Sequence, residues 1–159
     1  MPLSNYERMI QLAEDVFAVK EDPNQLDVDQ KVLERLQKMH PATISEYSDG
    51  NGPVAWVLVI PTTGELMKQF LENKISEKEL FELTPLNVKY DALYLCSALV
   101  LEEYRRKGIS KRLTLEAIDK ISKDHPIKAL FAWPFTKEGN LALEEIARLV
   151  SLPMHKHQE

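Results

Sequence analysis

The sequence has a single cysteine and no long apolar run, and each of these features excludes some kinds of structure. A single cysteine, Cys96, excludes an internal disulfide and makes the cytoplasm the expected location. One cysteine and four histidines do not predict a structural metal site. No apolar run approaches the roughly 20 residues of a membrane-spanning helix. The first residues also lack the basic start and apolar stretch of a signal peptide.

Positive charge is scarce over the chain as a whole. Twenty Lys and Arg residues face 25 Asp and Glu residues, giving a net charge of −5 and a pI near 5.5. A general nucleic-acid binder is usually basic, so nucleic acid is not an expected partner. At 159 residues, 44% hydrophobic and 28% charged, the composition is that of a globular protein. We expect one domain over residues 1–159 that binds neither nucleic acid nor membrane.

The first half of the chain alternates between helical and strand patterns. Apolar residues at helical spacing predict two helices within the first forty residues. Residues 43–47 and 54–60 then read as a strand pair, a hairpin with a longer loop. Two stretches with the spacing of a capping box, 62–65 and 76–79, each precede an apolar stripe. They predict a helical insert at about 62–86.

The second half predicts a strand, a helix and a strand in about 45 residues. Residues 92–101 are almost continuously apolar, as expected for a strand buried on both faces. A helix follows, with Ile109, Leu113, Ala117 and Ile121 recurring every four residues. A buried strand at 128–133 and a last helix at 141–152 complete the pattern. The predicted fold class is α/β (α+β) with a mixed sheet.

The turn between the first of these strands and its helix concentrates positive charge. Five basic residues and no acidic one occur at 105–112: Arg105, Arg106, Lys107, Lys111 and Arg112. The turn carries +5 in a chain of −5, so the remainder carries −10. Cations in a first helical turn cost about 0.3 to 1 kcal/mol each, because free amides already make that end positive. A bound phosphate would reverse this penalty, and Gly108 permits a close approach.

An ordinary surface is the alternative interpretation of the same turn. Glu102 and Glu103, just upstream, would neutralise part of the charge, and solvent would cover the rest. The turn matches neither the G-x-x-x-x-G-K-[ST] pattern of a P-loop nor the G-x-G-x-x-G dinucleotide fingerprint. On charge alone the two interpretations remain equally open.

The segment from Leu99 to Ser110 resembles motif A of the GNAT family of N-acetyltransferases. Arg105, Gly108 and Ser110 occupy the three places of its R/Q-x-x-G-x-G/A signature, after a strand that ends at Val100. The resemblance implies a GNAT-like mixed central sheet flanked by helices, of the acyl-CoA N-acyltransferase type. It also implies that acetyl-CoA or another acyl-CoA binds along the strand and the turn. The implied contacts are Ala98, Leu99, Val100, Arg105, Arg106, Lys107, Gly108, Ile109, Ser110 and Asn140.

The sequence departs from the family pattern at several places. Ser110 replaces the usual glycine or alanine. Ala147 stands where many members carry the tyrosine that acts as general acid. The usual first strand has little room, and only residues 153–159 remain for the usual strands after the last helix. A smaller sheet with an open edge is therefore expected, and a homodimer would cover it. The insert at 62–86 would be placed to cover the acceptor side.

The resemblance to motif A and the basic turn leave three functions open. The first is an acyl-CoA-dependent N-acyltransferase, with a small-molecule or peptide amine as acceptor. The second is a catalytically degenerate domain that binds CoA or a phosphate ligand as a sensor or interaction module. The third is an interaction domain whose basic turn meets an acidic partner. The general base and acid are not identified, and the available polar groups are Glu46, Tyr94, Ser97 and Glu102.

Overall fold

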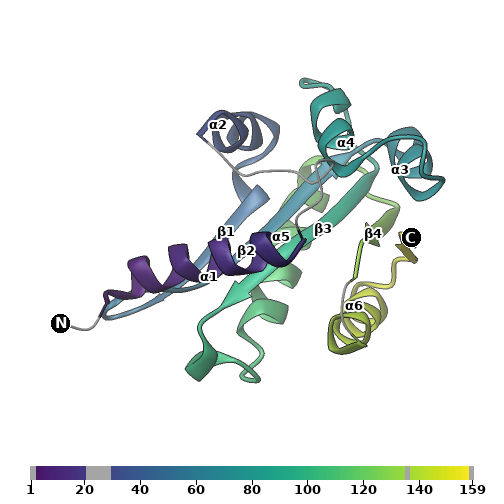
Figure 1. Ribbon diagram of the computed structural model, residues 1–159. Coiled ribbons are helices and arrows are strands. Elements are labelled where there is room, and N and C mark those ends of the chain that lie inside the picture. Colours follow the sequence, from purple (N-terminus) through teal and green to yellow (C-terminus); the bar gives the residue numbers. More distant parts are fainter. Residues whose placement is uncertain (1–2, 21–29, 135–136, 158–159) are drawn as a thin grey trace.

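The computed structural model describes residues 3–20, 30–134 and 137–157, and a five-stranded sheet lies at its centre (Figure 1). The strand order is β1-β2-β3-β4-β5. The first three strands pair antiparallel, and β3, β4 and β5 pair parallel, so the sheet is mixed as predicted. The strands are β1 (Ile44–Asp49), β2 (Gly52–Thr62), β3 (Ala92–Val100), β4 (Ala129–Ala132) and β5 (Met154–Lys156).

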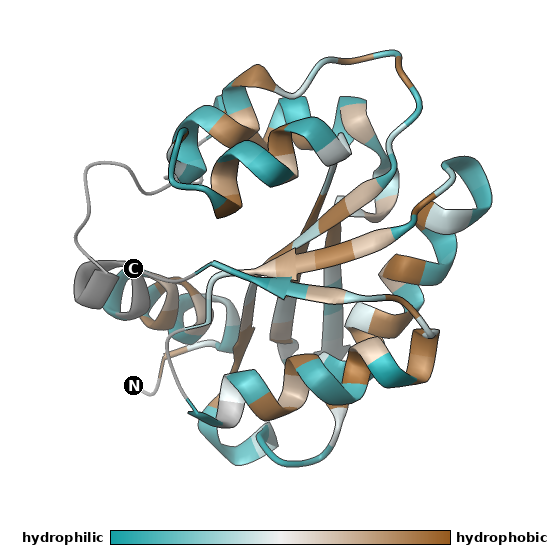
Figure 2. Cartoon of the chain, turned by 90° about the vertical axis from the view of Figure 1, so that its right-hand side faces the viewer, coloured by the Kyte–Doolittle hydropathy of each residue, from teal (hydrophilic) through white to brown (hydrophobic). Residues whose placement is uncertain are grey.

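Helices cover both faces of this sheet (Figures 1 and 2). One face carries α5 and α6, which pack on each other and on the sheet. The opposite face carries the four helices that precede β3. The helices are α1 (Asn5–Lys20), α2 (Gln30–Met39), α3 (Gly64–Leu71), α4 (Glu77–Leu83), α5 (Ile109–Asp124) and α6 (Lys137–Val150). None of the helices in the described ranges is both long and apolar enough to cross a membrane.

The two-residue repeat of the strands divides the core between the two faces. In β2, Val57 and Val59 pack against α5, whereas Leu58 and Ile60 pack against the helices of the opposite face. Phe70 of α3 is buried beside the strand residues of that second face. A central strand must therefore be apolar on both sides, which explains the near-continuous apolar run of β2.

The predicted helix starts form with the expected capping contacts. Ser4 Oγ accepts a hydrogen bond from the Glu7 amide at 3.1 Å, at the start of α1. Ser76 and Glu79 form the complete capping box of α4. The cap of α3 is one residue later than the sequence pattern places it, because Thr63 accepts the bond and Thr62 belongs to β2.

Three predictions about the sheet are corrected by the structure. The hairpin loop is short, since Asp49 pairs with Gly52 across a two-residue turn. A short strand, β5, does form after the last helix and pairs with β4, so the C-terminal end is less reduced than expected. The strand at 92–101 is fully buried only in its first part. From Leu95 onward β3 is half-buried, except that Ala98 is exposed and Leu99 is buried.

Candidate functional site

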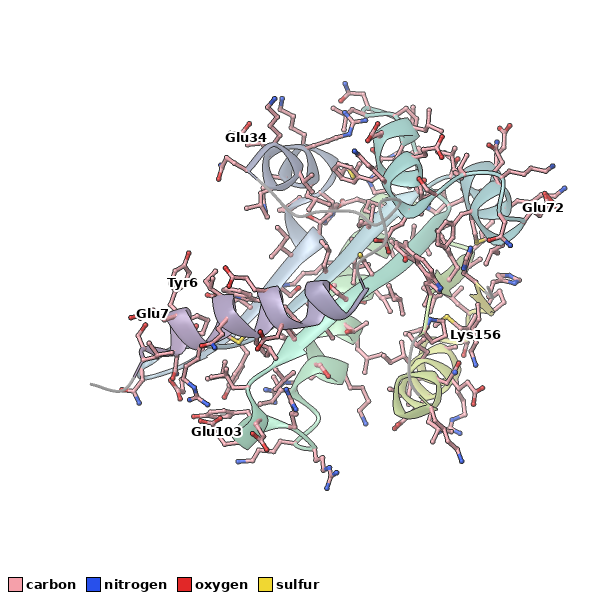
Figure 3. All side chains as sticks on the ribbon, in the orientation of Figure 1. Tyr6, Glu7, Glu34, Glu72, Glu103 and Lys156 are labelled. Atoms are coloured by element: carbon pink, nitrogen blue, oxygen red, sulfur yellow. The ribbon has the colours of Figure 1, made fainter. Side chains whose placement is uncertain are left out.

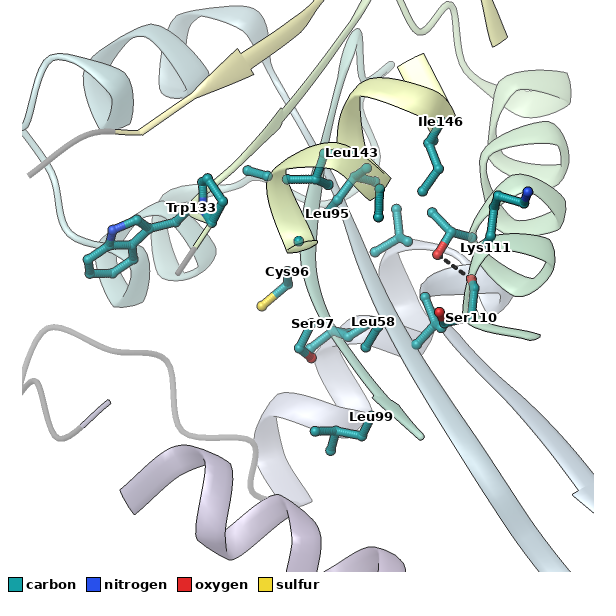
Figure 4. A pocket seen from close by; sticks show the side chains of 18 residues that line it. Leu58, Leu95, Cys96, Ser97, Leu99, Ser110, Lys111, Trp133, Leu143 and Ile146 are labelled. Atoms are coloured by element: carbon teal, nitrogen blue, oxygen red, sulfur yellow. Dashed lines mark hydrogen bonds between the residues drawn. The ribbon is translucent and has the colours of Figure 1, made fainter. Parts of the chain in front are cut away.

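The exposed part of β3 lies where the parallel strands separate. β3 pairs with β4 only over Ala92–Tyr94, opposite Ala129–Phe131. Beyond this point β4 ends, and a cavity of about 290 Å³ opens between β3, the start of α5 and α6 (Figure 4). The β3 side chains that line it are Leu95, Cys96, Ser97, Ala98 and Leu99. Loss of the neighbouring strand thus leaves one edge of β3 available to an extended ligand.

A bulge in β3 shapes the floor of this cavity. Ser97 pairs with Leu58 of β2, and Leu95 pairs with Val59, so Cys96 is the extra residue of the bulge. The extra residue interrupts the alternation of side chains between the two faces of the sheet. It also kinks the strand at the place where β3 and β4 part. Cys96 and Ser97 both line the cavity as a result.

At one end of the cavity the chain winds into α5 through two left-handed residues. Arg106 has a φ of 66° and Gly108 a φ of 76°. This winding turns successive amides toward the same space before the helix begins. No described residue accepts a hydrogen bond from the amides of residues 106–111. Ser110 and Lys111 line the cavity, so the amide-rich turn and the cavity form one continuous site.

The basic side chains of the turn are mostly held by contacts within the protein. Arg105 Nε donates to the Val100 carbonyl at 3.0 Å and so ties the turn to the end of β3. Lys111 Nζ lies 3.0 Å from Glu145 Oε1 of α6. Lys107 and Arg112 each lie over a tyrosine ring, at 5.4 Å and 5.3 Å from the ring centre. Of these four residues only Lys111 also lines the cavity.

The acidic residues upstream of the turn do not neutralise it in the way the alternative interpretation requires. Glu103 instead binds Arg8 of α1 through two hydrogen bonds of 2.7 and 2.6 Å. The bonds from the Arg8 guanidinium lower the pKa of Glu103 to about 2. One of the two carboxylates is therefore already paired with a cation outside residues 105–112. Glu102 is exposed.

The sequence-predicted contact residues fall into two groups. Ala98, Leu99 and Ser110 line the cavity, whereas residues 105–108 are exposed in the turn that precedes Ser110. Val100 is half-buried, and Ile109 belongs to the core under α5. Asn140 is half-buried in α6 but does not line the cavity, whereas its neighbour Gly139 does.

The polar groups considered for catalysis are not gathered at one point. Tyr94 is buried and donates its hydroxyl hydrogen bond to Glu77 of α4, and burial raises its pKa well above the usual value. Glu46 accepts a 2.7 Å bond from Trp56 Nε1 on the hairpin. Only Ser97 among these candidates lines the cavity. Ala147 is half-buried against the core, so that position supplies no acidic or hydroxyl side chain.

Sequence reasoning missed the wall that α6 contributes. Gly139, Ala142, Leu143 and Ile146 face the cavity, and the small residues among them leave it room. Helical spacing alone cannot tell such a wall from an ordinary core face. The insert helices α3 and α4 contribute no lining residue to this cavity. That the insert covers the acceptor side stays a prediction. No cluster of His, Cys, Asp or Glu that could hold a metal ion occurs in the ranges the structure covers.

Comparison with known proteins identifies the fold but gives no close relative. No protein-family model matches the sequence, and no curated protein matches it. A solved structure of the NatB acetyltransferase complex bound to a bisubstrate inhibitor is similar, with a TM-score of 0.52 and 13% identity. The match covers 84% of this chain and 66% of that one.

Two further structures give the same picture. A ribosomal-protein-alanine N-acetyltransferase from Brucella melitensis biovar Abortus 2308 has a TM-score of 0.50 and 17% identity, over 89% of this chain and 83% of that one. Naa20 from Chaetomium thermophilum has a TM-score of 0.47 and 14% identity, over 82% of this chain and 59% of that one. This chain thus spans less than two thirds of the Naa20 and NatB chains. The mixed sheet, its separated parallel strands and the matches to the NatB complex and the Brucella enzyme show that the chain has the fold of the GNAT N-acetyltransferases.

Proposed function

We propose that this chain is an acyl-CoA-dependent N-acyltransferase, with acetyl-CoA as its donor and a primary amine as its acceptor. One observation carries the proposal. At the start of α5, amides with no acceptor among the described residues lie beside basic side chains, and this turn leads into a cavity that runs along the free edge of β3. Phosphates suit the first feature and an extended, amide-bearing chain suits the second. A CoA thioester has both parts in one molecule.

The chain's own residues would divide the binding task as follows. Amides of residues 106–111 would hold the pyrophosphate, with Arg106 supplying an uncommitted charge beside them. The backbone of Ala98, Leu99 and Val100 would pair with the amides of the pantetheine arm. Leu143 and Ile146 of α6 would exclude water from the thioester. We also propose that residues 1–159 act as one GNAT-like domain, in which the helical insert at 62–86 has a structural role.

The thioester supplies an activated acyl group. The protein therefore has only to hold the amine against the acyl carbon and to move a proton from the amine to the leaving sulfur. A carbon–nitrogen bond to the amine forms, the carbon–sulfur bond breaks, and the sulfur leaves as a thiolate that must take up a proton. Ser97 lines the cavity at the bulge and is the hydroxyl placed to hydrogen-bond a group there. We assign it the role of a proton carrier between the two reactants.

A second candidate function is favoured by one specific observation. Ala147 occupies the place of the usual proton-donating tyrosine and packs against the core. A domain with an intact donor site but no acid would bind acyl-CoA without transferring the acyl group, as a sensor or interaction module. Binding and turnover must therefore be measured separately.

The experiment that tests the proposal follows acetyl-CoA in two assays. Isothermal titration measures binding, and thiol release with mass spectrometry of the amine measures transfer. The enzyme is supported if both succeed and if Ser97→Ala lowers kcat while leaving the dissociation constant of acetyl-CoA unchanged. Binding without transfer to any amine supports the sensor, and absence of binding refutes both.

A further inference from the structure

A second cavity lies on the opposite face of the sheet from α5 and α6. Its volume is about 480 Å³, and it is bounded by α1, α2 and the strands β1 to β3. This volume falls in the range of about 300 to 1,000 Å³ that small-molecule sites occupy. Tyr6 of α1 stands at its rim, exposed on the surface (Figure 3).

The two cavities share lining residues of the sheet at the bulge of β3. Both are lined by Val57, Leu58, Ser97 and Leu99. These residues come from the two strands that pair where Cys96 interrupts the ladder. A group held in the second cavity therefore lies next to the part of the first cavity where β3 and β4 separate. Two reactants on opposite faces would meet at Ser97.

The lining of the second cavity is almost entirely apolar. Tyr6 and Trp56 stand edge to face, with ring centres 6.2 Å apart. Ala13 and Leu33 supply aliphatic surface from the two helices, and no carboxylate or cation is among the described lining residues. The indole N–H of Trp56 is engaged by Glu46 at 2.7 Å, which turns the ring's apolar surface to the cavity. Such a lining favours an uncharged hydrocarbon group and disfavours a polycation or a polyol.

We infer that the second cavity binds the apolar group of the acceptor, which is a primary amine bearing an aromatic or branched aliphatic substituent. The same chemistry occurs in a small arylalkylamine and in the first residue of a peptide with an apolar N-terminus. The inference rests on the proposed function and specifies its acceptor. The neutral amine nitrogen forms the new bond to the acyl carbon, the carbon–sulfur bond breaks, and the surplus proton of the amine passes by way of Ser97 to the departing thiolate.

The two tryptophans of the chain provide separate reporters for the two cavities. Trp56 lines only the second cavity, and Trp133 lines only the first. In Trp133→Phe, titration with 2-phenylethylamine, leucinamide or a peptide with N-terminal leucine should change the emission of Trp56 and saturate. In a series of linear alkylamines the dissociation constant should fall about fourfold for each methylene buried. Spermidine should produce no saturable change.

A matched pair of substitutions assigns each ligand to its cavity. Ala13→Phe fills the second cavity and Ala142→Phe the first, each from a helix. Ala13→Phe should weaken amine binding at least tenfold and leave acetyl-CoA binding unchanged, and Ala142→Phe should do the reverse. Circular dichroism checks that both fold. If Ala13→Phe does not, Tyr6→Ala replaces it, because the Tyr6 side chain is largely exposed and contributes little to the core.

The outcomes separate this inference from the proposed function. If acetyl-CoA quenches Trp133 in Trp56→Phe but no apolar amine perturbs Trp56, the inference is overturned and the enzyme proposal stands. If amines perturb Trp56 but acetyl-CoA does not bind, the proposed function fails while the second site remains. A dissociation constant independent of alkyl length, or tighter binding of spermidine, also overturns the inference. Saturation by leucinamide and by the peptide alike supports a peptide N-terminus, and by 2-phenylethylamine alone a small amine.

Discussion

Substitutions at the two left-handed residues of the turn should separate its effect on folding from its effect on ligand binding. A Cβ built at Gly108 meets no heavy atom within 4 Å, so Gly108→Ala costs only backbone strain. That strain is about 1 kcal/mol, which lowers Tm by about 2 to 4 °C in a domain of this size. Arg106→Gly removes a similar strain at a φ of 66° and should leave Tm unchanged or raise it by up to about 3 °C.

Both substitutions should nevertheless weaken the binding of acetyl-CoA. Removal of the Arg106 charge beside a phosphate loses about 1 kcal/mol at an exposed site, or about fivefold in the dissociation constant. The added methyl group at Gly108 stands in open space, and we expect it to crowd a pyrophosphate held by the neighbouring amides. At about 100 times its dissociation constant, acetyl-CoA should stabilise the native protein by about 2.7 kcal/mol, or about 5 to 10 °C. The ligand-induced shift should be smaller by about 1 kcal/mol or more in each variant.

Differential scanning fluorimetry with and without acetyl-CoA measures both effects in one experiment. Because the two variants are expected to change Tm in different directions without ligand, a loss of stability cannot explain a shared loss of binding. Lys128→Gly, at an exposed position far from the turn, serves as the control for a basic residue replaced by glycine. If Arg106→Gly and Gly108→Ala both keep the full ligand-induced shift, the turn does not hold the pyrophosphate and the proposed donor site is wrong.

Three further predictions concern folding and assembly. Glu103 has a pKa of about 2 in the folded protein against 4.5 ordinarily, so its contribution to stability is present above pH 4.5 and is lost toward pH 2. Glu103→Gln should therefore flatten the pH dependence of Tm between these values. Salt should reduce the difference in Tm between the native protein and this variant, because the Arg8–Glu103 pair is exposed. Tyr94→Phe removes a hydrogen bond to the buried carboxylate of Glu77 and should lower the free energy of unfolding, measured with urea, by about 1 to 3 kcal/mol. The loss should be smaller in Tyr90→Phe, because the Tyr90 hydroxyl donates to the Pro85 carbonyl and not to a carboxylate. The strands β1 and β5 stand at the edges of the described sheet, and we expect a homodimer that covers one of them; sedimentation as a monomer at high concentration would contradict this.

Local patterns in the sequence were sufficient for most of the fold. The capping box at Ser76 and the stripe from Ile109 to Ile121 depend on contacts within one helix or one face, and both are present. The hairpin loop was predicted too long because Asp49 stabilises the tight turn through its own side chain, accepting a 2.7 Å bond from the Asn51 amide. β5 was missed because a strand of three residues carries no periodicity, and only its pairing with β4 defines it.

The candidate site was predictable only at its turn. Gly108 and its basic neighbours stand in consecutive positions, so their chemistry is visible in the sequence. The cavities depend on long-range geometry: residues of α6 face β3 across a gap, and Tyr6 meets Trp56 fifty residues away in the chain. The ion pair between Glu103 and Arg8 could not be predicted either, because Arg8 lies 95 residues earlier in the chain. No local pattern encodes such pairings.

The unequal length of the two central parallel strands explains why a site exists at all. β3 has nine residues and β4 only four, so most of β3 has no neighbour on that side. Pro134, which follows closely on β4, has no amide hydrogen with which to extend the ladder. The unpaired N–H and C=O groups at the edge of a strand can pair with another protein strand. A bulge such as that at Cys96 disfavours this pairing, because it bends the strand. The free edge is thereby available to the acyl-CoA that we propose, and Ser97 beside the bulge lines both this cavity and the apolar cavity of the opposite face.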